Sequence, residues 1–409
     1  MRIARSAVLV FGMFFTICGM ANAAETSVPE PFQGHDENSQ YSIDYSDLSA
    51  ILKAVVVDTG RSTRRTATEA DDLTGTRVKA KIKKTANEAN RFYYETFEDD
   101  DEAAAFLKEI QLSLEALPSE APLEHFSRDE QLAYWLNLYN VTVLNEVIAV
   151  YPRNNLKKYV TGKNSIFSRK LLEVAGIPLS LDDIQYTILK QNYDNDPLIM
   201  YGLYKGIIGG PNIRKTAYTG SDVYRALKNN AIEFVNSNRG TYIHSEKTFR
   251  VSSLYERNKV YFPDFESDLS AHLLDFIEGE ERSALQTARK IKANIDDWAV
   301  TDLGGTHRRV GGSLADSRAA LMDSVKSTVP ADGGGVTGAA VGAGSSFMAA
   351  KGRQLSLARI DPSLLEVLQD IDEKRLSENQ RKSSVDIEEL DSSPDDANTE
   401  TSTDPEQNQ

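Results

Sequence analysis

Cysteine is almost absent from this sequence of 409 residues. The single one, Cys18, lies inside an apolar run over residues 7–20 that follows two arginines. Because small residues at Ala21 and Ala23 come next, the leader has the pattern of a secretory signal peptide, and we expect cleavage after Ala23. The mature chain, starting at Ala24, would contain no cysteine, which excludes disulfides, thiolate metal ligands and a cysteine nucleophile.

A membrane anchor is the alternative interpretation of the leader. The apolar run is shorter than the roughly 20 residues that a spanning helix needs, and no stop-transfer pattern follows it. Lipid attachment at Cys18 is disfavoured because the residue before it, Ile17, is not small. We therefore predict a periplasmic or extracellular protein without a transmembrane segment in the mature chain.

Basic residues are also in short supply. The chain has 46 lysines and arginines against 61 acids, a formal net charge of -15. A broad basic face for nucleic acid is therefore not expected. The hydrophobic fraction of 40% is ordinary for a chain with one sizeable core.

Patterns typical of metal or serine-hydrolase sites are missing as well. The five histidines are scattered, without the i, i+4 pairing or the glutamate neighbour of a zinc helix. Asp194-Asn195-Asp196 begins like a calcium loop, but Leu198 stands where a third oxygen ligand is needed. No Gly-x-Ser-x-Gly elbow occurs. We predict neither a metal site nor a cofactor.

Composition divides the chain into four parts. We assign residues 1–23 to the signal peptide, 24–40 to an N-terminal extension, 41–300 to one globular domain, and 301–409 to a flexible Gly/Ala/Ser-rich linker with an acidic tail. The end of the chain has almost no apolar residues, so it cannot bury enough surface to fold alone. A solvated, disordered tail is favoured over a partner-binding motif.

Helical spacing of apolar residues recurs within the globular part. We expect helices over residues 103–117, 128–150, 223–235, 269–277 and 285–298, the first ended by Pro118. Capping boxes begin at Ser127, Ser180 and Ser253, each with an acid three residues later. Strands are expected over 171–175 and in a hairpin of 242–244 with 248–251. The fold class predicted is α+β, a predominantly helical single domain with a small antiparallel strand component.

Two amides stand out in the helix predicted after Ser127. Asn137 and Asn140 share one face of a helix that is otherwise rich in large apolar and aromatic residues. Buried amides are costly unless they form hydrogen bonds. They therefore hold either a neighbouring loop of the protein or a ligand.

A glycine-rich segment follows over residues 201–219. Gly206, Gly209 and Gly210 would let backbone amides approach a ligand closely, and Arg214 and Lys215 would add positive charge. The segment fails as a nucleotide-binding loop because an arginine replaces the second glycine and a proline lacks the amide hydrogen. An anion- or glycan-binding loop and a purely structural turn both remain open.

Four blocks of the sequence resemble, in order, the signature blocks of domain-of-unknown-function family 547. They are RDEQLAYWLNLYNVTVLNEVIAVYP, VAGIPLSLDDIQYTIL, DPLIMYGLYKGIIGGPNI and VSSLYERNKVYFPDF, and the resemblance spans about residues 41–274. The resemblance implies the extent of the domain and carries no settled activity.

The chain departs from many members of that family at four positions. They have a histidine and cysteines where this sequence has Met200, Lys205 and Gly210, and an acid where it has Gln185. The sequence is more similar to an exported bacterial branch without these cysteines. Thiol chemistry of the wider family therefore does not transfer.

Two functional hypotheses follow. The first is a non-catalytic envelope module that binds an anionic or glycan ligand, or another envelope component, in one pocket formed by the amide helix and the glycine-rich segment. Its candidate residues are Asn137, Asn140, Lys205, Gly209, Gly210 and Arg214. The alternative is a cysteine-independent envelope hydrolase with carboxylate and histidine acid–base chemistry, for which the candidates are Glu130, Asp183 and His244. Whether the protein is an enzyme stays open on the sequence.

Overall fold

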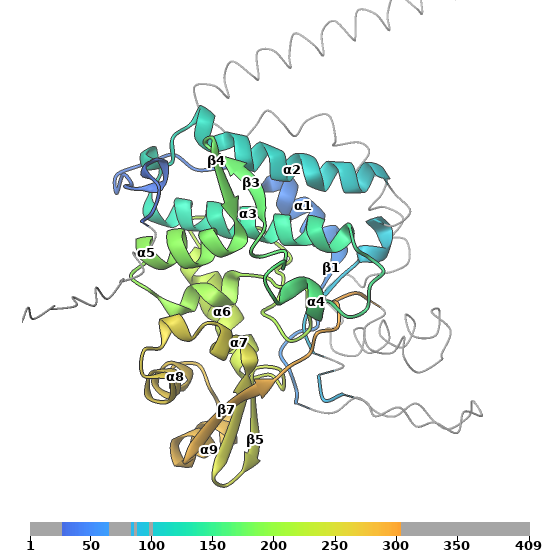
Figure 1. Cartoon of the computed structure of the whole chain (residues 1–409), viewed down its shortest axis with the longest axis vertical. Helices are drawn as coiled ribbons and strands as arrows, with labels where there is room; N and C mark the ends of the chain where they lie inside the picture. Colours follow the sequence, from blue (N-terminus) through green and yellow to red (C-terminus); the bar gives the residue numbers. More distant parts are fainter. Residues whose placement is uncertain (1–26, 65–82, 86–87, 98–100, 304–409) are drawn as a thin grey trace, which may run out of the picture.

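A computed structural model describes residues 27–64, 83–85, 88–97 and 101–303 (Figure 1). The predicted signal peptide and residues 304–409 of the predicted C-terminal tail lie outside the described residues. The first three residues predicted as tail, 301–303, are instead buried against the domain. The described part is rich in helix with small, mostly antiparallel sheets, which confirms the α+β class.

The elements follow one another along the chain without regular strand–helix alternation. The α-helices are α1 (Ser46–Val55), α2 (Asp101–Glu120), α3 (Arg128–Ile148), α4 (Lys157–Val160), α5 (Lys190–Asn192), α6 (Val223–Val235), α7 (Ser253–Arg257), α8 (Phe265–Leu274) and α9 (Gly279–Thr287). The strands are β1 (Val56–Val57), β2 (Arg91–Phe92), β3 (Lys170–Val174), β4 (Ile177–Ser180), β5 (Thr241–Ser245), β6 (Thr248–Ser252) and β7 (Lys290–Ile295). Short 3₁₀ helices are η1 (Glu30–Phe32), η2 (Tyr94–Phe97), η3 (Leu123–His125), η5 (Pro197–Gly202) and η6 (Lys259–Tyr261), and η4 (Asp183–Leu189) is a π-helix.

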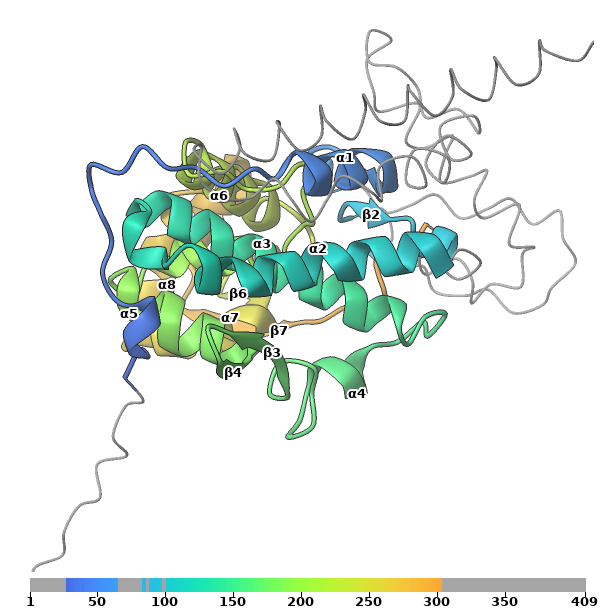
Figure 2. The same cartoon turned by 90° about the horizontal axis from the view of Figure 1, so that it is seen from above.

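Helix α3 lies at the centre of the larger core. It packs along α2, with the β3–β4 hairpin beside the pair (Figures 1 and 2). Every side chain of α3 from Glu130 to Leu144 is buried, because the helix is covered on all sides. Its predicted start is confirmed, since the Ser127 hydroxyl accepts a hydrogen bond of 3.2 Å from the backbone N–H of Glu130.

Pro118 does not end α2, contrary to the prediction. The helix continues to Glu120 with the proline inside it. A proline cannot donate to the carbonyl four residues earlier, which here belongs to Leu114. The hydroxyl of Tyr134 donates to that carbonyl at 2.9 Å, so the freed acceptor keeps a partner and the helix tolerates the proline.

A second core cluster lies between α6, α7, α8 and the sheet of β5, β6 and β7. The predicted hairpin and the predicted helix over 223–235 are confirmed as β5–β6 and α6. The helix predicted over residues 285–298 is wrong, because α9 ends at Thr287 and β7 follows. Strand β7 pairs in parallel with β6, and it alternates exposed and half-buried residues as an edge strand does.

The other two capping boxes differ in outcome. Ser180 and Asp183 bond reciprocally, with the Asp183 N–H donating to the serine hydroxyl at 3.1 Å and the Ser180 N–H donating to the carboxylate at 2.6 Å. At α7 the cap is Ser252, not Ser253 as predicted, and its hydroxyl accepts from the backbone N–H of Leu254 at 3.1 Å. Asp182 and Gln185 lie within or just after the first cap, and Arg257 and Asn258 come just after the second. All four residues line one pocket.

Candidate functional site

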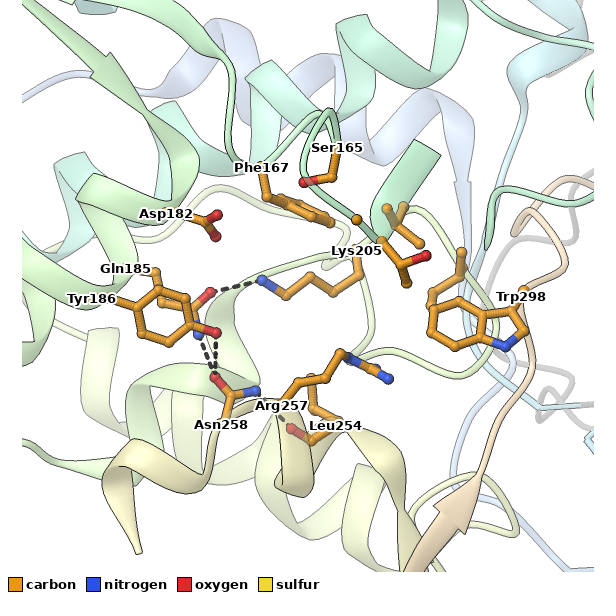
Figure 3. A pocket seen from close by; sticks show the side chains of 14 residues that line it. Ser165, Phe167, Asp182, Gln185, Tyr186, Lys205, Leu254, Arg257, Asn258 and Trp298 are labelled. Atoms are coloured by element: carbon orange, nitrogen blue, oxygen red, sulfur yellow. Dashed lines mark hydrogen bonds between the residues drawn. The ribbon is translucent and has the colours of Figure 1, made fainter. Parts of the chain in front are cut away.

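A pocket of about 280 Å³ opens where η4, the glycine-rich segment, α7 and the chain after β7 come together (Figure 3). Its size is at the lower end of the range for small-molecule sites. It is lined by Val160, Thr161, Gly162, Ser165, Phe167, Asp182, Gln185, Tyr186, Lys205, Ile207, Leu254, Arg257, Asn258 and Trp298. We call it the Lys205 pocket.

Lys205 enters this pocket from the glycine-rich segment and is buried. Its ammonium group donates to the Tyr139 hydroxyl and, at 2.8 Å, to Oε1 of Gln185. The Nζ atom also lies 4.8 Å from the ring centroid of Tyr139 and 4.5 Å from that of Phe167. Both hydrogen-bond partners of Nζ are therefore neutral side chains. Among the described residues, no carboxylate forms an ion pair with Lys205.

Burial determines the protonation of this lysine. Desolvation disfavours the charged form and lowers the pKa of Lys205 to about 7. The Asp182 carboxylate raises this pKa and the Arg257 guanidinium lowers it further, but both effects are smaller than that of burial. The amine is therefore half-protonated close to neutral pH.

Asp182 supplies a carboxylate to the same pocket. The reciprocal box between Ser180 and Asp183 fixes the chain at this point, and the Asp182 N–H donates to the carbonyl of Phe167 at 2.8 Å. The side chain is half-buried, and burial raises its pKa, while the nearby Lys205 lowers it. An acid with a raised pKa beside an amine with a lowered one is the kind of pairing found at sites of proton transfer.

Neutral amides fix the wall next to the lysine. Nε2 of Gln185 donates to Oδ1 of Asn258 at 2.6 Å, and the hydroxyl of Tyr186 donates to the same oxygen at 3.1 Å. Nδ2 of Asn258 donates to the Leu254 carbonyl at 2.8 Å. This chain of bonds orients the Gln185 amide, so that its oxygen points at Lys205 (Figure 3).

Arg257 and Trp298 form another part of the wall, away from the lysine amine (Figure 3). The guanidinium lies 5.0 Å from the Trp298 ring centroid and donates to the Ser253 hydroxyl at 2.6 Å. It also faces the Asp296 carboxylate at 3.6 Å. Burial lowers the pKa of Arg257, but an arginine stays charged at physiological pH.

The two helix amides bind the backbone of the glycine-rich segment. Asn137 donates to the carbonyl of Tyr218 at 2.8 Å and accepts from its N–H at 2.9 Å. Asn140 donates to the carbonyl of Gly202 at 2.9 Å and accepts from the N–H of Tyr204 at 2.9 Å. Each amide thus satisfies two backbone groups, as in the loop-holding alternative. Their role in ligand binding stays a prediction.

Replacing Asn140 by aspartate is expected to lower the free energy of unfolding by about 2 kcal/mol at neutral pH. The aspartate keeps the acceptor for the Tyr204 N–H but loses the donor to Gly202, and it brings a buried charge. Urea denaturation followed by circular dichroism measures the change. The exposed Asn229 on α6, changed in the same way, is the control and should stay within about 0.5 kcal/mol of the wild type.

The glycine candidates do not present free amides to a ligand. The N–H of Gly209 donates to the Asp297 carbonyl and that of Gly210 to the Ile207 carbonyl, at 2.8 and 3.1 Å. Neither glycine lines the Lys205 pocket. Arg214 stacks on Tyr218, with its guanidinium 4.7 Å from the ring centroid.

The candidate residues therefore divide between two places. Asn137, Asn140 and Arg214 line a separate hollow of about 10 Å³, which has room for about one water molecule. Lys205 alone of the ligand-binding candidates lines the larger pocket, to which α3 contributes no lining residue. A single pocket shared by the amides and the lysine is not what the geometry shows.

The hydrolase candidates lie apart from the pocket. The carboxylate of Glu130 accepts from the N–H groups of Ile43 and Gly220, both at 3.0 Å. Asp183 caps η4, and His244 is exposed on β5. No cluster of three or more potential metal-ligating side chains occurs in the described ranges.

Sequence reasoning missed most of the pocket. The missed residues include Phe167, Asp182, Tyr186, Arg257, Asn258 and Trp298, and Gln185 was noted only as a departure from the family pattern. They come from segments far apart in the chain, so no spacing could reveal that they converge. One usable signal was that Asp182 and Arg257 lie inside the second and fourth resembling blocks.

In a comparison with family models, residues 123–235 match the one described as "Protein of unknown function, DUF547". No curated protein matches the chain, and no solved structure does. The match contains three of the four resembling blocks, together with Asp182, Gln185 and Lys205, but not Arg257 or Trp298. The resemblance to this family is thus confirmed over residues 123–235, the range that carries the amine side of the pocket.

Proposed function

We propose that this chain is an exported envelope protein whose Lys205 pocket binds a small anionic ligand that also carries hydroxyl or carbonyl groups. Export is supported by the leader, with its apolar run and the small residues before Ala24. Amino-terminal sequencing of protein from the envelope fraction tests that part. Among the described residues, no helix is long and apolar enough to cross a membrane.

The observation that carries the binding proposal is the unpaired charge of Lys205. Buried cations are normally paired with a carboxylate, because desolvation is costly. In the described structure Lys205 has only neutral hydrogen-bond partners, yet it lines an open pocket. An anion entering the pocket would supply a directly bonded counter-charge, in addition to the longer-range effect of Asp182, and would raise the pKa of the lysine again.

The rest of the wall specifies the class of ligand. Arg257 adds a guanidinium that suits a carboxylate or phosphate. The amide Asn258 and the hydroxyl of Tyr186 are groups that bind sugar hydroxyls, and the faces of Phe167 and Trp298 suit the carbons of a small ring. A uronic acid combines these features, so acidic sugars are the class that we test first.

The affinity for glucuronate is expected to fall at least ~10-fold in Lys205→Gln. The wild type should bind neutral sugars such as glucose even more weakly than Lys205→Gln binds glucuronate. Trp298 lines the pocket and Trp135 does not, so a change in tryptophan fluorescence on ligand binding reports on Trp298. For the wild type, affinity should fall as the pH rises above about 7, because the lysine loses its proton.

Lys158→Gln is the matched control, because this lysine is exposed and outside the pocket. It should bind like the wild type, and Trp298→Phe should bind but lose most of the fluorescence response. Equal affinities of wild type and Lys205→Gln for glucuronate would show that the pocket does not bind anions through this residue.

A further inference from the structure

We propose that Lys205 is a nucleophile, and that its amine forms an imine with the carbonyl of a small oxo acid bound in the pocket. The proposal rests on the anion binding proposed above, and it adds a covalent step and a substrate class. The geometry that carries it is the arrangement of the amine, the Asp182 carboxylate and the Arg257 guanidinium in one pocket (Figure 3).

The hydrogen-bond partners of Nζ suit a neutral amine. A neutral amine has two N–H groups and one lone pair, and the hydroxyl of Tyr139 and the amide oxygen of Gln185 accept two hydrogens. Gln185 cannot easily turn its NH₂ group towards the lysine, because Asn258 holds that group at 2.6 Å. The lone pair is then free to meet a ligand in the pocket.

The surroundings also favour the neutral state. Among the described residues no carboxylate pairs with Lys205, and the rings of Tyr139 and Phe167 enclose its side chain. Desolvation accordingly lowers the pKa of Lys205 to about 7. Lysines that are desolvated in this way are the ones that form Schiff bases with carbonyl substrates.

Asp182 is the group available for the proton transfers. The amine lone pair attacks the carbonyl carbon, a C–N bond forms, and the carbonyl electron pair moves onto the oxygen. Nitrogen then loses a proton to the Asp182 carboxylate, which passes it to the alkoxide and gives the neutral carbinolamine. The second nitrogen proton follows the same route to the hydroxyl oxygen as the C–O bond breaks, so that water leaves and the C=N bond forms. The products are an imine and one water, so the step needs neither oxidant nor reductant.

Arg257 defines the acidic end of the substrate. Its guanidinium and the Lys205 amine line different parts of the pocket, which therefore suits a molecule with a carbonyl at one end and a carboxylate at the other. Small 2-oxo acids and open-chain uronic acids have this form. At about 280 Å³ the pocket has room for molecules of this size.

Borohydride trapping tests the proposal, because it reduces an imine to a stable secondary amine. The full chain is incubated with cyanoborohydride and either an acid probe (pyruvate, 2-oxoglutarate or glucuronate) or the neutral ketone acetone, and peptide mass spectrometry locates the adduct. We expect preferential labelling of Lys205 at neutral pH, at least ~10-fold faster than that of the exposed Lys158, which is not desolvated in a pocket. Lys205→Gln should lose this adduct, Asp182→Asn should slow its formation, and Arg257→Gln should reduce labelling by the acids but not by acetone.

Lactate and gluconate, which have a carboxylate but no reactive carbonyl, separate the two proposals. If they bind by fluorescence titration while no probe labels Lys205, the imine proposal is wrong and anion binding stands. If neither binding nor labelling occurs, both are wrong. Labelling spread over surface lysines and unchanged in Lys205→Gln also overturns the imine. Thermal melting of each variant shows whether it is folded. Lys205→Arg keeps the positive charge but has no primary amine, so it should also form no adduct, which checks the result for Lys205→Gln independently.

Discussion

Lys205→Met is expected to raise the free energy of unfolding by on the order of 3 kcal/mol at about pH 6. The buried lysine has its pKa lowered from 10.5 to about 7, so keeping it charged in the folded protein costs free energy. Methionine has a similar length and no charge, which removes this cost. The gain is smaller than the pKa shift alone would give, because Tyr139 and Gln185 lose a donor.

The pH dependence identifies the cause. Between about pH 7 and 10.5 the unfolded chain keeps a proton that the folded lysine has lost, so the wild type gains stability as the pH rises. Below about pH 7 both states are protonated and the full cost is present. The advantage of Lys205→Met should therefore be constant below neutrality and shrink towards pH 10, as measured by urea denaturation. Lys158→Met is the exposed control, and a destabilised Lys205→Met at low pH would contradict the prediction.

Gly209→Ala is expected to lower the free energy of unfolding by about 3 kcal/mol. A Cβ atom at this position would lie 2.7 Å from the backbone nitrogen of Asp297 and 2.8 Å from its carbonyl oxygen. Neither backbone atom can move freely, because the buried Asp297 carboxylate binds Lys83 and Thr85, both at 2.6 Å. The segment after β7 must shift, and Trp298 with it.

Gly210→Ala is the matched neighbour. There the nearest atom to an added Cβ is Cβ of Lys205 at 3.1 Å, a tight contact that a small shift relieves. We expect a loss of at most about 1 kcal/mol. Urea denaturation measures both variants, and Trp298 fluorescence shows whether the pocket wall has moved. Equal effects of the two substitutions would show that the approach to Asp297 is not what requires glycine at position 209.

Local signals in the sequence were enough to predict much of the fold. Helix α6 and the β5–β6 hairpin follow from apolar spacing and β-rich runs within single short segments. The start of α3 follows from the serine at Ser127, although the Glu130 carboxylate turned out to bind other segments. These features depend on neighbours in sequence, which a pattern can show.

Strand β7 shows where such reasoning failed. Residues 290–295 read KIKANI, in which Ile291, Ala293 and Ile295 alternate with polar residues, a period of two. The same residues also fit a helical stripe when they are joined to the preceding helix α9. The parallel pairing with β6 decides for the strand, and its partner lies about 40 residues earlier in the chain.

The site was predicted only in part. Lys205 was selected as a cation in a glycine-rich segment, and the structure places it in the pocket of about 280 Å³. Asp183 was considered as an acid, whereas its neighbour Asp182 lines the pocket and Asp183 caps a helix. Whether Asp182 or Asp183 faces the pocket depends on the orientation of the chain where the π-helix η4 begins. The rest of the pocket depends on contacts with α7 and Trp298 that arise only in the folded chain.

The segment after β7 has a further consequence for the order in which the molecule is completed. It bonds to three earlier parts of the chain: the Phe92 N–H donates to Thr301, the Leu156 N–H to Trp298 and the Ile208 N–H to Ala299, at 2.8, 2.9 and 2.8 Å. Synthesis runs from the amino terminus, so the ribosome releases these three acceptor residues after almost all of the described chain. A nascent chain that has reached only α6 already contains Lys205 but not the wall with Arg257 and Trp298. Completion of the pocket is therefore a late, long-range event: Tyr139, Phe167 and Gln185 around the amine are made early, whereas the wall with Trp298 is added only when the segment after β7 docks.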